Sequence, residues 1–242
     1  MKSVLLLAKR ELGYYLNTTW GYAILAMILV IDGILFNSFA MGQNTERYST
    51  DVLQDFFFFS SGTTMIAGVL ITMRLVAEER SSGTFTLLQT APVSEAQIIT
   101  GKYLGALSFL TLITACTIYM PILIEINGKV SWAQIGAGYL GLFLLGATTA
   151  SIGTFGSAIA KNQLFASILG GIFLVLMLLG WLLGKVTEAP LDSVFSYIAL
   201  FDRHFQPFMR GKINSESIIF YLSTTFIFLL ISIRVLQSRR IS

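Results

Sequence analysis

The sequence has almost none of the residues from which enzyme and metal sites are usually built. Cysteine and histidine each occur once, as Cys116 and His204, so neither an internal disulfide nor a cysteine or histidine cluster for a metal can form. The Gly-x-x-x-x-Gly-Lys-Ser/Thr phosphate loop, His-Glu-x-x-His and Gly-x-Ser-x-Gly are all missing. We therefore expect a chain that carries out no chemistry itself and holds neither a metal nor a cofactor.

Charged residues are also scarce. They make up 12% of the 242 residues, against 55% that are hydrophobic, whereas soluble domains carry about 25% charged residues. This composition indicates a membrane protein. The apolar runs lack the alternation of barrel strands, so helices are expected to satisfy the backbone polar groups in lipid. The net charge of +3 is too small, and the basic residues too scattered, to suggest a nucleic-acid partner. No small-residue cleavage pattern follows a short apolar core at the N-terminus, so we expect no removed signal peptide.

Six apolar runs reach the roughly 20 residues that cross a bilayer core. They are predicted at residues 20–40, 53–76, 103–124, 132–160, 164–184 and 217–236. The expected fold class is an all-α membrane protein with six transmembrane helices in a single domain, residues 1–242. Ten Lys and Arg residues fall on the side of the N-terminus and six on the other, which predicts that both termini are cytoplasmic.

Two further helical elements are expected outside these spans. Residues 1–16 combine an apolar face with charged residues, a pattern typical of an amphipathic helix in the membrane interface; the alternative is an extension of the first span into water. Residues 185–216 are too apolar for an ordinary loop and too broken to span, which predicts short re-entrant or interfacial helices. Within them, Asp202 and His204 form either a proton-linked site or, as a single histidine favours, a polar helix junction.

The polar stretch from Met73 to Tyr103 separates the second and third spans. Gly83 permits a sharp turn, Pro92 ends a short apolar segment, and Ser94 begins a capping-box pattern that starts the next helix. The pattern predicts a short helix at residues 84–90 with an apolar face toward water, which is typical of a docking element for a partner protein. The alternative is a solvated connector between two spans.

Polar residues inside the spans are candidates for lining a transport path. Asp32 lies near the middle of the first span, where a carboxylate costs roughly 2.5–3.5 kcal/mol on insertion scales. It therefore lines a cavity or bonds to a neighbouring helix. The hydroxyl residues Ser60, Ser61 and Thr64 of the second span suit a packed or cavity-facing helix.

Small residues recur in the fourth span at intervals of three and four. This spacing places them on one helix face and predicts a groove for another helix. The residues are Gly146, Ala150, Gly153, Gly156 and Ala160.

Several of these motifs together resemble a known family. Glu78-Glu79-Arg80-x-x-Gly83-Thr84, then Leu87-Leu88, Pro92-Val93-Ser94 and Gly101-Lys102-Tyr103, resembles the first cytoplasmic loop of the type-2 ATP-binding-cassette (ABC) exporter permeases. Lys9-Arg10-Glu11-Leu12, with Asn17, Gly21 and Tyr22, is similar to the elbow helix and the start of span one in these proteins. The stretch Tyr197 to Gly211 is similar to one subgroup, the permeases associated with bacterial gliding-motility ABC transporters.

The resemblance implies the membrane subunit of an ABC exporter in the bacterial cytoplasmic (inner) membrane. ATP and Mg would be bound by a separate ATPase subunit, and a second permease subunit would complete a homodimer or heterodimer. Residues 1–16 would be the elbow helix, with Lys9, Arg10 and Glu11, and residues 77–102 the coupling loop, braced against it by Glu78, Glu79 and Arg80. The ATPase-coupling residues would be Glu78, Glu79, Arg80, Gly83, Thr84, Phe85, Leu87, Leu88 and Pro92.

Two other functions stay open on the sequence. The chain can be a mechanotransmitter, which passes the work of an ATPase to a periplasmic or motility accessory protein without carrying cargo. It can also be an ion-driven carrier that uses Asp32, although the inverted repeats common in such carriers are not seen.

Overall fold

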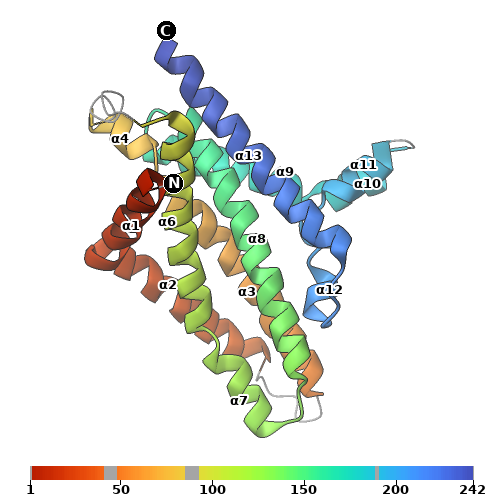
Figure 1. Ribbon diagram of the computed structural model, residues 1–242. Helices are drawn as coiled ribbons and strands as arrows, with labels where there is room; N and C mark the ends of the chain where they lie inside the picture. The colour runs from red at the N-terminus through yellow and green to blue at the C-terminus, as the bar shows by residue number, and fades with distance from the viewer. Residues whose placement is uncertain (1, 41–47, 85–92, 189–190, 242) are drawn as a thin grey trace.

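The computed structural model describes residues 2–40, 48–84, 93–188 and 191–241. The regular elements within these ranges are all helical (Figure 1). In chain order they are α1 (Lys2–Asn17), α2 (Thr19–Leu35), the π-helix η1 (Phe36–Ala40), α3 (Ser49–Thr72), α4 (Ala77–Ser81), α6 (Glu95–Cys116), α7 (Tyr119–Asn127), α8 (Trp132–Ile159), α9 (Gln163–Leu178), α10 (Gly180–Val186), α11 (Leu191–Ile198), α12 (Gln206–Met209) and α13 (Ser215–Ile241).

Within the described ranges, five helical segments are long and apolar enough to cross a membrane. They are Thr19–Ser38, Ser49–Ser81, Glu95–Ile126, Trp132–Ile159 and Ser215–Ser238. A sixth span is present if α9 and α10, which meet at an angle of 47°, are counted as one. The predicted all-α membrane protein is confirmed. The fifth span, predicted at residues 164–184, corresponds to this bent pair of helices.

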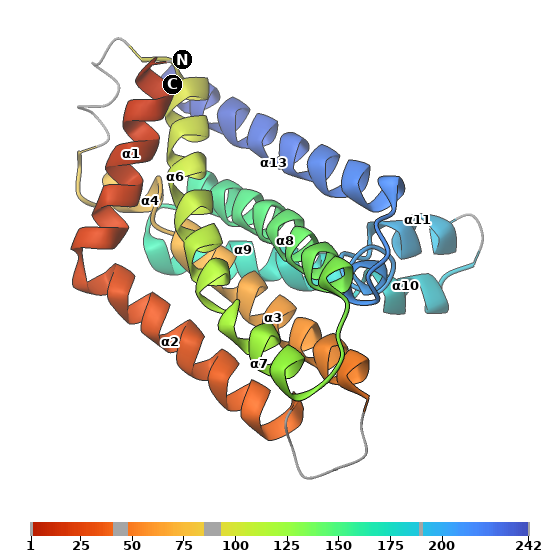
Figure 2. The ribbon, with the colours of Figure 1, turned by 60° about the horizontal axis from the view of Figure 1, so that its bottom comes forward.

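Helix α8 is the centre of the bundle and is buried along most of its length. It packs against α3, α9 and α13 (Figure 2). Its small residues allow close approach, but to several helices rather than the one predicted. Gly153 lies against Thr72 of α3, Gly156 lies against Gly170 of α9, and Gly146 faces α6. The reason is that α8 has neighbours on nearly every side.

Helix α6 begins earlier than the third span was predicted to begin. The capping box is confirmed: the Ser94 hydroxyl accepts from the Gln97 backbone N–H at 3.3 Å, and the Gln97 side chain accepts from the Ser94 N–H at 3.2 Å. At its other end α6 breaks after Cys116 and continues as α7. Pro121 explains this break, because it cannot donate to the carbonyl of Thr117 four residues earlier.

The segment between α9 and α13 contains the short helices that the sequence predicted there. Helices α10 and α11 pack side by side and extend away from the bundle (Figure 1). Their close contact depends on Gly180, whose Cα lies near the backbone of Phe195 and Ala199. Before α12, the buried His204 Nε2–H donates to the carbonyl of Tyr197 at 2.9 Å, and its ring stacks on Phe220. His204 therefore acts as a polar residue at a helix junction.

Candidate functional site

A buried lysine joins three helices at the end of the bundle that leads into the polar loop. The side chain of Lys102, on α6, is only 2% exposed. Its Nζ donates to Oε1 of Glu11, on α1, at 2.9 Å and to Oε1 of Glu79, on α4, at 2.8 Å. A buried ammonium is tolerated only when such partners offset its lost hydration. Lys102 therefore links α1, α4 and α6 through charge.

Arg10 adds a second positive charge to this cluster. Its Nη2 lies 3.3 Å from Oε1 of Glu79 and 3.6 Å from Oε1 of Glu11, and its side chain is 55% exposed. Two cations thus face two carboxylates, and we call Arg10, Glu11, Glu79 and Lys102 the inner ion cluster. Of the three charged residues expected on the elbow helix, Arg10 and Glu11 belong to it. Lys9 points to solvent.

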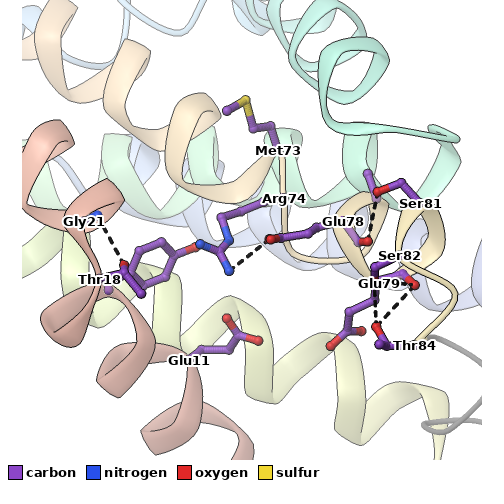
Figure 3. Close-up of polar contacts among 12 residues, drawn as sticks. Glu11, Thr18, Gly21, Met73, Arg74, Glu78, Glu79, Ser81, Ser82 and Thr84 are labelled. Carbon is purple, nitrogen blue, oxygen red and sulfur yellow. Dashed lines mark hydrogen bonds and ion pairs between the residues drawn. The ribbon is translucent and has the colours of Figure 1, made fainter.

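Contacts of Arg74 and Tyr15 fix the end of α3 against α1. Arg74 and Glu78 point toward one another in Figure 3, with Nη2 and Oε2 2.9 Å apart. The Arg74 guanidinium also lies 3.5 Å from the centre of the Tyr14 ring, a cation–π contact. The Tyr15 hydroxyl donates to the carbonyl of Ile71 at 2.7 Å. Burial raises the pKa of Tyr15, which keeps the hydroxyl neutral and able to donate.

The segment after α3 is also attached to the C-terminal end of α8. The Ser157 hydroxyl accepts from the N–H groups of Val76 and Ala77, both at 3.0 Å, and donates to the carbonyl of Met73 at 2.9 Å. One buried hydroxyl thereby pairs a carbonyl at the end of α3 and two N–H groups at the start of α4, groups that helix ends leave without helical partners. The segment is therefore held on both sides, by α8 and by the inner ion cluster.

The three residues of the predicted brace have different partners in the described structure. Glu78, Glu79 and Arg80 were all expected to hold the loop against the elbow helix. Among the described residues, Glu79 is the one whose carboxylate pairs with α1, through Arg10. Glu78 pairs with Arg74, and Nη1 of Arg80 donates to the carbonyl of Ala160 at the end of α8 at 2.9 Å. The helical spacing explains this, since consecutive residues on α4 point about 100° apart and cannot share a partner.

The cavity between these groups has a volume of about 550 Å³ and is lined by side chains of α1, α4 and α6. It leads to the turn at Gly83, whose φ of +73° lies in the left-handed region that favours glycine. Thr84 follows, and its hydroxyl lies 2.9 Å from that of Ser82. The rest of the predicted helix at 84–90, with Phe85, Leu87 and Leu88, and Pro92 after it, lies outside the described residues. No group of three or more potential metal ligands gathers in the described ranges.

The candidate path residues are divided between two sides of α3. Oδ1 of Asp32 accepts from the Thr63 hydroxyl at 2.7 Å, so the carboxylate is bonded to a neighbouring helix. Asp32, Ser60 and Thr64 also border an internal space of only about 10 Å³, which is barely the size that one water requires. Ser61 instead faces a separate apolar groove on the side of the bundle. The structure thus brings together three of these four residues.

Lys102 is the important residue to which the sequence interpretation assigned no role. A signal for it exists, because Lys102 stands between two glycines four residues apart on α6. A Cβ on Gly101 would lie 2.7 Å from Cβ of Leu7, and one on Gly105 would lie 2.5 Å from Cβ of Glu11. Both glycines therefore mark the face of α6 that α1 covers. A lysine at the edge of such a face needs an anion nearby.

A comparison with protein families gives a match over most of the chain. A family model described as ABC-2 family transporter protein matches residues 35–238, which is most of the chain. A search of curated proteins finds none that matches. The matched range includes Glu79 and Lys102 but begins after α1, so the two α1 members of the inner ion cluster, Arg10 and Glu11, lie outside it.

Proposed function

We propose, because the chain belongs to the ABC-2 family of transporter proteins, that it is the permease subunit of an ABC exporter whose energy comes from a separate ATPase subunit. The chain is a multi-pass membrane protein, as its candidate spans and family require. The observation that carries the coupling part of this proposal is the inner ion cluster. It links the segment that leads into the polar loop to α1 and α6.

In this proposal, ATPase binding and closure displace the segment 77–102, and the ion cluster passes that displacement on. A movement of α4 is passed from Glu79 to Lys102, on α6, and from Lys102 to Glu11, on α1. It also acts through Arg80 and Ser157 on the end of α8. Buried, hydrogen-bonded ion pairs suit this task, because breaking one leaves an uncompensated charge and is costly. The attached helices therefore move with the segment.

The finer assignments are proposals of the same kind. We place both termini in the cytoplasm of a bacterial cell, with α1 as the elbow helix and residues 84–90 as the coupling helix against the ATPase. Gly83, Thr84, Phe85, Leu87, Leu88 and Pro92 then shape that contact. Two copies, or this chain and a second permease, would form the complete transporter. The assignment to the gliding-motility subgroup rests on the stretch from Tyr197 to Gly211, which is similar to that subgroup.

The hairpin of α10 and α11 favours a second candidate, the mechanotransmitter. The hairpin extends from the bundle and exposes Leu191 and Val194, which gives an accessory protein a surface to contact (Figure 1). An ion-driven carrier has less support, because Asp32 is hydrogen-bonded to Thr63 beside a space of about 10 Å³. A measured flux of cargo separates the exporter from the mechanotransmitter.

The test of the proposed function is copurification and ATP hydrolysis with candidate ATPase subunits. We expect an ATPase to bind the native chain and Leu88→Asp to release it, because a carboxylate on the docking face would lose its hydration there. Ile213→Asp is the matched control, since Ile213 is 57% exposed and lies just before α13, at the opposite end of the bundle. An ATPase that binds native and Leu88→Asp chains equally would place the contact elsewhere.

A second variant separates binding from coupling. Glu79→Gln removes one carboxylate from the inner ion cluster without altering the predicted docking helix. We expect the ATPase to remain bound while ATP hydrolysis no longer responds to the membrane subunit. Unchanged hydrolysis in that variant would show that the cluster has only a structural role.

A further inference from the structure

An apolar groove opens on the side of the bundle between α2, α3 and the bend that joins α9 to α10. Its volume is about 590 Å³. Its walls include Ile31 of α2, Phe58 and Ile66 of α3, and Trp181 of α10, and each of these side chains is more than one third exposed. The groove is therefore open to the surroundings of the bundle, which for a membrane protein are lipid.

The length of the groove matches one leaflet of a bilayer. From Phe58 to Ile66 the groove follows eight residues of α3, or roughly 12 Å at the helical rise. Half of a bilayer core is about 15 Å thick. Because the groove follows the middle of α3, it lies within the membrane core.

The groove ends at a polar recess that shares one residue with it. Asp202 borders both the groove and a second hollow of about 260 Å³. The recess also contains Gln206, Arg210, Lys212 and Asn214. In the described ranges, no ion pair joins Asp202, Arg210 or Lys212 to another residue of the chain. Two cations and one carboxylate thus stand at the polar end of an apolar slot.

We propose that the groove and recess together bind one phospholipid whose headgroup carries an amine. An acyl chain would fill the groove, the phosphate would lie between Arg210 and Lys212, and Asp202 would accept from the headgroup ammonium. Charge-assisted contacts of this kind are the strong ones. A second copy of the chain would fill the apolar groove as well, but it would not explain why a recess of mixed charge continues it. The lipid site does not depend on the proposed coupling to an ATPase.

The proposal that an acyl chain occupies the groove is tested by a substitution that fills the groove. Gly62 lines it, and a Cβ built there meets no atom within 4 Å, so the side chain of Gly62→Leu can extend from α3 into the groove. The full chain is exchanged into vesicles of equal phosphatidylethanolamine and phosphatidylglycerol, extracted in mild detergent and weighed intact by native mass spectrometry. We expect bound lipid to fall roughly tenfold in the variant, which corresponds to burying a few methylene groups less. Gly136→Leu is the control, because its Cβ is equally unobstructed on an exposed face of α8.

The recess is tested by its preference between the two headgroups. The native chain is expected to retain phosphatidylethanolamine over phosphatidylglycerol, and Asp202→Asn to lower that ratio roughly tenfold, as expected for one charge-assisted bond. Arg210→Gln with Lys212→Gln should lower the retention of both lipids. Equal retention of the two lipids by the native chain would overturn the proposal. So would a Gly62→Leu chain that keeps its lipid but loses a dimer seen for the native chain, because a second copy would then cover the groove.

Discussion

Lys102 is a full charge held almost entirely out of water by two carboxylates. We expect Lys102→Met to lower the stability of the chain by about 3–5 kcal/mol, because Glu11 and Glu79 would then lose their buried cation and keep only the exposed Arg10. Thermal unfolding in detergent measures this change. Lys161→Met, at an exposed lysine, is the control for loss of charge alone.

The inner ion cluster also allows a test of whether unpaired charge is what destabilises the Lys102→Met variant. Replacing all three charges, with Lys102→Met, Glu11→Gln and Glu79→Gln together, should recover most of the lost stability, since no unpaired charge then stays buried. If the triple variant were less stable than Lys102→Met, packing rather than charge would hold these helices together.

His204 gives the chain a dependence on pH that is easy to isolate, because it is the only histidine. Burial lowers the pKa of His204 in the folded chain, whereas an unfolded histidine titrates near about 6.5. As pH falls through that value the unfolded chain takes up a proton that the folded chain refuses, so stability is lost toward low pH. We expect His204→Gln to remove this loss between about pH 7.5 and 5.5, on either side of the unfolded value. A parallel decline of both chains in thermal unfolding would contradict the assignment.

Single residues also show what the sequence could and could not predict about the site. The turn at Gly83 and the capping box at Ser94 are local, so the pattern around each was sufficient. The two partners of Lys102 are distant in the sequence: Glu79 is 23 residues away and Glu11 is 91 residues away. Their choice depends on how α1 and α4 pack, which no local pattern records.

Helices α8 and α9 approach so closely that their contact tolerates only glycine. A Cβ on Gly156 would lie 2.9 Å from the carbonyl oxygen of Ala166 and 2.9 Å from the backbone nitrogen of Gly170. Since both atoms are backbone, neither can rotate away, and Gly156→Ala must separate the two helices. We expect a loss of about 1–3 kcal/mol, typical of overpacking.

The matched control for that element is Gly136→Ala on the same helix, whose new Cβ meets nothing within 4 Å. It should unfold at or slightly above the native temperature, because alanine favours a helix over glycine. Similar unfolding temperatures for the two variants would mean that α8 and α9 are not in close contact in the membrane.

The elements themselves were predicted well where hydrophobicity alone decides them, and less well where tertiary packing intervenes. The apolar runs located the spans because a bilayer demands length and apolarity. The break between α6 and α7 has a local cause in Pro121 and could have been predicted. The 47° bend between α9 and α10 has no such local cause, because it depends on how Gly180 packs against the backbone of α11.

The orientation of the whole molecule in the membrane gives a direct prediction. In a Cys116→Ser background, Ile213→Cys should react with an impermeant maleimide on intact cells, and Ser82→Cys only after the membrane is opened. Both positions are exposed and lie at opposite ends of the bundle. The reverse pattern would place the polar loop outside the cell and exclude an ATPase docked on it.

The central position of α8 has a consequence for how the protein is made. Of the five long spans in the described ranges, α8 has the lowest mean hydropathy. Its hydroxyl groups face protein; Thr148, for example, donates to the carbonyl of Tyr221 on α13 at 3.2 Å. Yet α13 begins only at Ser215, so α8 leaves the ribosome well before this partner exists. A nascent chain released before α13 would expose those hydroxyls to lipid, and the cell's quality-control proteases could recognise it as unfinished.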